Sequence, residues 1–156
     1  MLSLDQAQKK IIETLYPAPT ENIPFSQCQS RILAQDIIAT RQLPPFSNSA
    51  MDGYAVRSAD TSNATRQNPV ALEVTQTIAA GSTPSRILEP GEAFRIYTGA
   101  MIPQGADAVV IQENTDRRDD TVHIYQKARP KQHIRFKGED VELGNAILKK
   151  GTKIGP

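Results

Sequence analysis

The change in the pattern of apolar and turn-forming residues after residue 45 restricts the fold of this chain more than any other feature. Beyond Pro44 and Pro45, short apolar runs alternate with glycine, proline, asparagine and aspartate. Short apolar runs are typical of strands, and these four residue types supply the turns that join strands. The sequence therefore predicts a β-rich region after the two prolines.

The candidate strands lie at residues 54–56, 70–78, 93–97, 108–112, 121–125 and 146–149. Turn chemistry between them is expected at Asp52-Gly53, Pro90-Gly91 and Asp119-Asp120. The segment at residues 60–68 is rich in Ser, Thr and Asn, so we expect an exposed loop there.

The first residues of the chain predict one amphipathic helix. Its apolar residues recur at helical spacing, namely Leu4, Ala7, Ile11, Ile12 and Leu15. Ser3, with Gln6 three places later, has the form of a capping box at the start of this helix. A second short helix could begin at Ser26, but residues 31–38 could equally form a strand. The predicted fold class is therefore mainly β with a few helices (α+β).

Composition narrows the function classes. The 38% hydrophobic content beside 22% charged residues is typical of a soluble globular protein. A formal net charge of +1 provides no field to attract nucleic acid or an anionic membrane surface. The single cysteine, Cys28, cannot form an intrachain disulfide or a zinc cage, which favours a reducing cytoplasm. No apolar run approaches membrane-spanning length, so we expect no membrane partner.

The densest group of polar residues lies at residues 44–56 (PPFSNSAMDGYAV). Asn48, Ser49 and Asp52 place an amide, a hydroxyl and a carboxylate on one proline-held loop, and loops of this kind often carry function. The alternative is a rigid turn with Asp52 and Gly53 at its tip. The residues alone leave both interpretations open.

Two further stretches could carry chemistry. At residues 95–100 (RIYTGA) a strand ends in Thr98 and Gly99, which would leave a backbone N–H free to approach an anion, although a simple strand exit explains the pattern equally well. At residues 137–140 (KGED), Glu139 and Asp140 could hold a hard cation such as Mg²⁺ through oxygen ligands. An acidic turn on a solvated face is the alternative.

These stretches, in this order, resemble the molybdopterin molybdotransferase family, known as MoeA in bacteria and as the E domain of gephyrin. The opening signature is carried by residues 31–37 and 43–56, the second block by residues 95–100 and 103–113, and the third by residues 138–141. The resemblance covers most of the chain from residue 31 onward.

The resemblance implies a domain organisation. Residues 1–42 and 138–156 would form an elongated, discontinuous dimerisation domain, and residues 43–137 would form a compact β-rich domain inserted into it. The substrate-binding domain and the C-terminal domain of the family are expected to be absent from this sequence.

The resemblance also implies an activity: insertion of molybdate into adenylylated molybdopterin, with Mg²⁺ assisting, by a homodimer. The molybdopterin adenylyltransferase is a further expected partner. Three positions match the family's functional polar residues and are the catalytic candidates: Asp52, Thr98 and Asp140. Substrate binding is assigned to Asn48, Ser49, Gly99 and Glu113. The expected metal ligands are Asp52, Asp140 and Glu139.

Two hypotheses for the function follow, one of an enzyme and one of a non-catalytic module. The first is an N-terminal fragment of the transferase, inactive by itself, whose residues complete a site formed mostly elsewhere. The second is a non-catalytic dimerisation or scaffold module. A stand-alone Mg²⁺ hydrolase using Asp52 and Asp140 is a weaker third reading, because no residue has the form of a nucleophile activated by a base.

Overall fold

The computed structural model describes residues 2–16 and 18–155, and within them the chain is mainly β, as predicted. The helices are α1 (Leu4–Thr14) and the short 3-10 helices η1 (Phe25–Gln27), η2 (Ser58–Thr61) and η3 (Gln112–Asn114). The strands are β1 (Ile37–Ile38), β2 (Asn48–Ser49), β3 (Gly53–Val56), β4 (Val70–Ile78), β5 (Glu92–Ile96), β6 (Ala108–Ile111), β7 (Thr115–Arg118), β8 (Thr121–Ile124), β9 (Ile134–Arg135) and β10 (Ala146–Leu148). In the part of the chain described, no helix has the length and apolar character needed to cross a membrane.

The chain divides into two compact units. Residues 1–37 and 146–156 form one unit, and residues 38–145 form the other. The two ends of the second unit are joined by backbone hydrogen bonds, from the Ala39 N–H to the Asn145 carbonyl at 2.8 Å and from the Gly144 N–H to the Ala39 carbonyl at 2.9 Å. The predicted domains were residues 1–42 with 138–156, and residues 43–137. The two units have other boundaries, and the domain boundaries stay a prediction.

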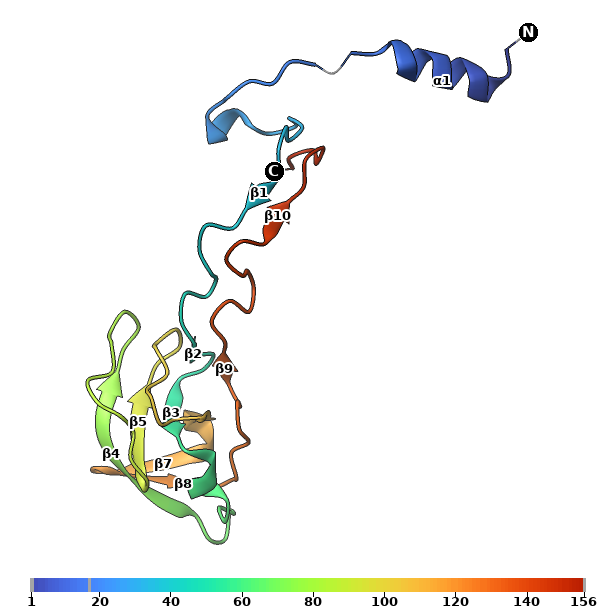
Figure 1. The fold of residues 1–156 in the computed structure, drawn as a ribbon. Coiled ribbons are helices and arrows are strands. Elements are labelled where there is room, and N and C mark those ends of the chain that lie inside the picture. Colours follow the sequence, from blue (N-terminus) through green and yellow to red (C-terminus); the bar gives the residue numbers. More distant parts are fainter. Residues whose placement is uncertain (1, 17, 156) are drawn as a thin grey trace. The chain divides into compact units, whose positions relative to one another are not determined.

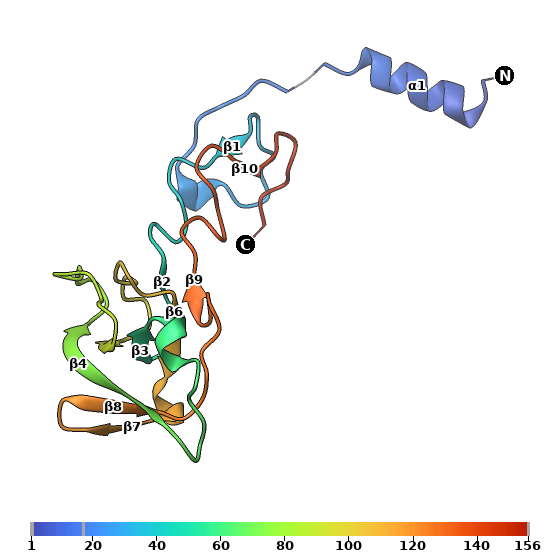
Figure 2. The ribbon, with the colours of Figure 1, turned by 60° about the horizontal axis from the view of Figure 1, so that its bottom comes forward.

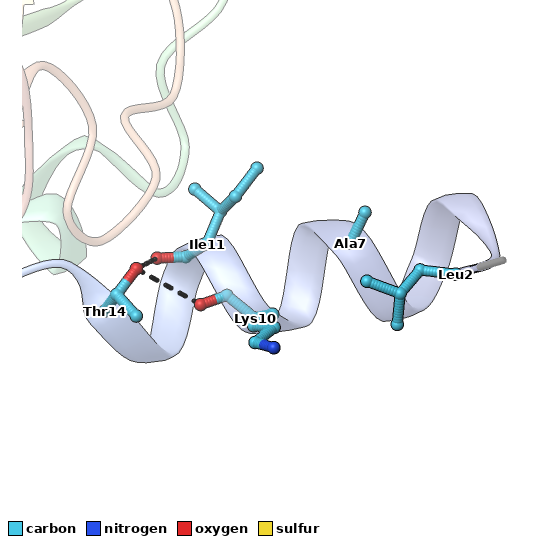
Figure 3. A pocket seen from close by; sticks show the side chains of 5 residues that line it. All are labelled: Leu2, Ala7, Lys10, Ile11 and Thr14. Carbon is cyan, nitrogen blue, oxygen red and sulfur yellow. Dashed lines mark hydrogen bonds between the residues drawn. The ribbon is translucent and has the colours of Figure 1, made fainter.

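Helix α1 confirms the expected capping box. The Ser3 hydroxyl accepts a hydrogen bond from the Gln6 N–H, and the Gln6 side chain accepts one from the Ser3 N–H. No residue of the helix is buried, and its large apolar side chains are exposed. Figure 3 shows a shallow hollow on this helix, lined by Leu2, Ala7, Lys10, Ile11 and Thr14.

Beyond η1, residues 30–38 pair with residues 146–154 to form a ribbon of extended segments. Ile32 forms an antiparallel bridge with Lys153, and the Leu33 N–H donates to the Thr152 carbonyl at 2.9 Å. Strand β1 pairs with β10, and both lie side by side in Figure 1. The sequence left open a short helix from Ser26 or a strand at residues 31–38. The structure has the short 3-10 helix η1 near Ser26, and extended chain that includes β1 within residues 31–38.

The second unit is built on a six-stranded sheet with the order β6-β3-β5-β4-β8-β7. All neighbouring strands are antiparallel except β4 and β5, which are parallel and shift register between Val74 and Gln76. Figure 2 shows the hairpin of β7 and β8 beside β4. The predicted turn Asp119-Asp120 joins that hairpin, and Asp119 adopts the positive φ that aspartate tolerates.

Two hydrophobic clusters form the core, and strands contribute to them alternately because successive side chains point to opposite faces of a sheet. Tyr54 and Val56 of β3 belong to one cluster, and Ala55 between them belongs to the other. The buried members of the first cluster are Tyr54, Val56, Ala64, Leu72, Ala93, Ala108, Val110, Val122, Ile124 and Ala128. The second contains Ala55, Ile78, Leu88, Phe94, Ile96, Ala100 and Val109.

The interpretation of residues 44–56 as a turn with Asp52 and Gly53 at its tip is wrong in part: Asp52 lies in the bend at residues 50–52, but Gly53 does not. It begins β3 and pairs with Ile96 on one side and Ile111 on the other. A Cβ atom at this position would lie 2.0 Å from the Val110 carbonyl oxygen. The glycine is needed because the backbones of β3 and β6 approach too closely for any side chain.

The expected exposed loop at residues 60–68 is wrong in part. Thr61 and Ala64 are buried. Thr61 also joins this segment to Ala128, which is distant in the sequence. Its hydroxyl donates to the Ser58 carbonyl at 2.9 Å and accepts from the Ala128 N–H at 2.9 Å. A polar composition did not reveal that one hydroxyl satisfies two buried backbone groups.

The close approach at Gly53 predicts that Gly53→Ala destabilises the second unit by about 3 kcal/mol or more, because the methyl group meets a backbone carbonyl that cannot move away cheaply. Chemical denaturation followed by circular dichroism measures the change. Gly155→Ala is the matched control, since its Cβ would meet nothing within 4 Å. A midpoint for Gly53→Ala equal to that of the control would contradict the packing described.

Candidate functional site

Asp52 and Thr98, two of the predicted catalytic residues, form a polar pair in the second unit. The Asp52 Oδ1 atom accepts hydrogen bonds from the Thr98 N–H at 2.8 Å and from the Thr98 hydroxyl at 2.7 Å. The sheet register produces this contact: Gly53 is opposite Ile96, so the residue before β3 meets the residues that follow β5. Residues 46 positions apart in the sequence are thereby placed in direct contact.

The surroundings favour the ionised form of Asp52. The Thr98 N–H, and next the Thr98 hydroxyl, lower the pKa of the Asp52 carboxyl below its usual value, and the positive charge of Arg95 acts in the same direction. Solvation of the exposed pair limits the energetic consequence of this shift. The geometry nevertheless provides a carboxylate with a fixed orientation.

Ser49 and Gly99 connect this pair to strand β2. The Gly99 N–H donates to the Ser49 carbonyl at 2.8 Å, and the Ser49 N–H donates to the Ala100 carbonyl at 2.9 Å. The expectation of a free N–H at Gly99 is therefore wrong, because β2 uses that donor. The Ser49 hydroxyl is also engaged, since it donates to the Met51 carbonyl at 2.5 Å and the side chain is only 1% exposed.

On its other side, β2 pairs with β9, which brings in the second acidic group. Asn48 is opposite Arg135, and Arg135 Nη2 donates to both carboxylate oxygens of Asp140, at 2.6 and 2.5 Å. Asp140 raises the pKa of Arg135 above its usual value. Glu139 accepts from the Phe136 N–H at 2.7 Å through Oε2. The sequence pointed to these acids but not to the single Arg135 nitrogen that holds Asp140.

Strand β2 is thus the element that joins the sequence-predicted residues. Asn48 and Ser49 contact the segment after Thr98 on one side and the segment before Asp140 on the other. Glu113 lies on η3 and is exposed, next to Gln112, whose N–H donates to the Asp52 carbonyl at 3.1 Å. The predicted residues therefore belong to one connected region of the second unit.

The arrangement does not fit a magnesium centre formed by this chain alone. Asp140 is occupied by Arg135, and Asp52 and Glu139 each give one oxygen to a hydrogen bond within the chain. Across residues 2–16 and 18–155, no three His, Cys, Asp or Glu side chains gather to hold a metal ion. Mg²⁺ binding by Asp52, Asp140 and Glu139 stays a prediction.

Arg95 is a residue of this region that the sequence analysis did not single out. Its guanidinium donates to the Gly53 carbonyl and to the Gln112 side chain, and it lies over the rings of Tyr54 and Tyr97. In the sequence it looks like an ordinary polar position of an alternating strand. The only signal was its place as the first residue of the stretch at residues 95–100 that contains Thr98.

Fold and site together define a mainly β protein whose polar residues gather where β3 begins and β5 ends. A family model described as "MoeA N-terminal region (domain I and II)" matches residues 2–156. The chain belongs to this family, which confirms the resemblance noted from the sequence motifs.

Individual relatives agree. The chain is 45% identical over 156 residues to molybdopterin molybdenumtransferase 2 of Mycobacterium tuberculosis H37Rv, and 42% identical over 158 residues to the molybdopterin molybdenumtransferase of Haemophilus influenzae. Each match covers 100% of this chain and 38% of the relative. The chain therefore spans little more than a third of these proteins.

A solved structure has the same fold. The molybdopterin biosynthesis moeA protein of Pyrococcus horikoshii OT3 matches with a TM-score of 0.83 and 39% sequence identity. The match covers 87% of this chain and 36% of that one.

The Asp52–Thr98 geometry predicts the effect of Thr98→Val, which removes the hydroxyl but keeps the N–H. The Asp52 pKa should rise yet remain below its value in the unfolded chain, because the larger cause of the shift is the backbone donor. Carboxyl ¹³C titration by NMR measures this. Since the folded pKa is the lower one, Asp52 stabilises the fold above its unfolded pKa, and this contribution is lost as pH falls through the folded pKa.

Thr83→Val serves as the control for that titration, because Thr83 is an exposed threonine of the same unit that makes no contact with Asp52 among those described. An Asp52 titration curve that is identical in all three proteins would contradict the pairing.

Proposed function

We propose that this chain supplies one part of the active site of a molybdopterin molybdenumtransferase, which inserts molybdate into adenylylated molybdopterin. The observation that carries the proposal is the connected polar region around β2, in which Asp52, Thr98 and Asp140 are held by backbone register. Membership of the family and the names of the relatives support the same reaction.

The roles of the residues follow from their contacts. Asp52 keeps one oxygen on Thr98, so its Oδ2 atom is the one that can accept a hydrogen bond from a substrate N–H or O–H group. Asp140 and Arg135 form a charge-assisted pair that orients both side chains beside Asn48. A preorganised acceptor and an oriented ion pair can position a substrate, which is how a fixed constellation assists catalysis.

The substrate-binding roles are revised by the geometry. Ser49 and Gly99 act through the backbone that supports Thr98, because their own donors are engaged within the chain. Asn48 and Glu113 remain candidates for direct contact with the pterin substrate.

Because the relatives are much longer, we propose that residues 1–156 alone are inactive and that the remaining site residues lie in regions of the kind the relatives carry beyond this match. The cytoplasmic location and the partnership with the molybdopterin adenylyltransferase stay predictions from the resemblance.

Complementation tests the catalytic proposal. The complete gene product that carries this sequence, expressed in a strain lacking its own molybdopterin molybdenumtransferase, should restore the activity of a molybdenum-dependent enzyme. Asp52→Asn and Asp140→Asn should each lower that activity at least about tenfold, because each removes a charge that positions the substrate or a neighbouring group.

Asp119→Asn is the matched control, because this carboxylate lies in the β7–β8 turn and asparagine tolerates its positive φ. Full activity of Asp52→Asn would remove Asp52 from the site. Restoration by residues 1–156 alone would show that the fragment is sufficient.

A dimerisation or scaffold role is the second candidate, and the exposed apolar side chains of α1 favour it. Leu4, Ile11, Ile12 and Leu15 are 59–75% exposed, an arrangement that monomeric proteins usually avoid on one helix face. We propose that this face contributes to a homodimer.

Light scattering on the purified chain measures this directly. The unsubstituted chain should have twice the monomer mass of 17.1 kDa, and Ile11→Lys should shift it toward the monomer by introducing charge into an apolar contact. Lys9→Gln, which removes only an exposed i,i+4 ion pair, should leave the mass unchanged. A monomeric unsubstituted chain would contradict the dimer proposal for these residues.

A further inference from the structure

We propose that Arg95 is a positioning residue, which holds Asp52 and Thr98 in their paired geometry by linking both ends of the loop around them. This inference rests on the site proposed above for its functional meaning, but the geometric part can be tested without any activity.

The Arg95 guanidinium is held by four separate contacts. Nη1 donates to the Gly53 carbonyl at 3.0 Å, and Nη2 donates to Gln112 Oε1 at 2.6 Å. The guanidinium carbon lies 5.2 Å from the centre of the Tyr54 ring and 4.9 Å from that of Tyr97. A group with this many contacts has a fixed position although it is only partly buried.

These contacts connect Arg95 to the backbone at Asp52 in two ways. Gly53 is the next residue in the chain, and the Gln112 N–H donates to the Asp52 carbonyl at 3.1 Å. Arg95 therefore binds the chain after Asp52 and, through Gln112, also supports Asp52 itself. Thr98 follows Arg95 by three residues on the same strand exit, so one side chain links both members of the pair.

Arginine is suited to this role and lysine is not. The planar guanidinium presents several N–H groups in a rigid fork, which reaches two acceptors on different elements while its faces meet aromatic rings. A lysine ammonium would keep the positive charge but could not serve the Gly53 carbonyl, the Gln112 side chain and two rings in one orientation. Charge and geometry can therefore be separated by substitution.

The charge has a smaller effect of its own. Arg95 lowers the pKa of Asp52, after the two hydrogen bonds from Thr98 that act in the same direction. If Arg95 acted only through its charge, Arg95→Lys would leave the pair unchanged. If it acts through its contacts, lysine should fail to replace it.

Hydrogen exchange of the Thr98 amide and the Asp52 carboxyl titration, both by NMR on the 156-residue chain, test the proposal. Arg95→Lys and Arg95→Gln should each accelerate Thr98 amide exchange roughly tenfold, which corresponds to the loss of about one net hydrogen bond. Both should raise the Asp52 pKa, with the larger rise in Arg95→Gln. Amides of the Val109 and Val122 core strands report whether each variant is folded.

Arg86→Gln is the matched control. Arg86 also lies over an aromatic ring, Phe94 at 5.2 Å, and hydrogen-bonds to Thr75 and Glu92, but it does not contact the loop around Asp52. It should leave both readouts unchanged. Thr98 exchange that is the same in Arg95→Lys as in the unsubstituted chain, or equally accelerated in Arg86→Gln, would overturn the positioning role.

Activity of the complete gene product separates this inference from the proposed function. Arg95→Lys should lower kcat more than it raises KM, because it disturbs the orientation of a group rather than the binding of substrate. If Asp52→Asn leaves activity intact, the proposed function of the pair fails, while the exchange measurement still decides what Arg95 does.

Discussion

The pairing of β3 with a strand on each side is the interaction on which the rest of the second unit depends. β3 pairs with β6 along its whole length and with β5 from Gly53 to Ala55, and its residues reach both core clusters. The backbones approach so closely at Gly53 that the strand admits no side chain there. Since Asp52 directly precedes this strand, the same register that packs the core also sets the position of the carboxylate.

Strand β2 has a different role, because it contributes almost nothing to the core yet connects the polar groups. Its two residues use their backbone toward Ala100 and Gly99 on one side and toward β9 on the other. The consequence is that Thr98 and the Arg135–Asp140 pair are supported by one short segment. A substitution at Asn48 or Ser49 that disturbs the backbone would therefore affect both the Asp52–Thr98 pair and the Arg135–Asp140 pair.

The sequence predicted the elements that have a strong periodic pattern and missed those that do not. The strand at residues 70–78 agrees with β4 because its run of apolar and β-branched residues is long. β7, with the sequence TDRR, was missed because an edge strand needs no apolar face, and β2 and β9 are too short to show any period. At the site, the residue types at Asp52, Thr98 and Asp140 were evident. Their contacts were not evident, because these depend on the register between strands that are distant in the sequence. For the same reason, neither the hydrogen bond of the Gly99 N–H nor the contacts of Arg95 could be predicted.

The hydrogen bonds between Ala39 and residues 144–145 have a consequence for the order in which the chain can fold. The second unit is continuous in sequence, whereas the first needs residues from both ends of the chain. During synthesis, residues 38–145 are complete before residues 146–156 leave the ribosome, so the β-rich unit can form first. Once formed, it holds its own two ends together, and the ribbon between residues 30–33 and 151–154 then closes across a short gap instead of across a loop of more than a hundred residues. The continuous unit can thereby bring the two segments of the discontinuous unit close together before they pair.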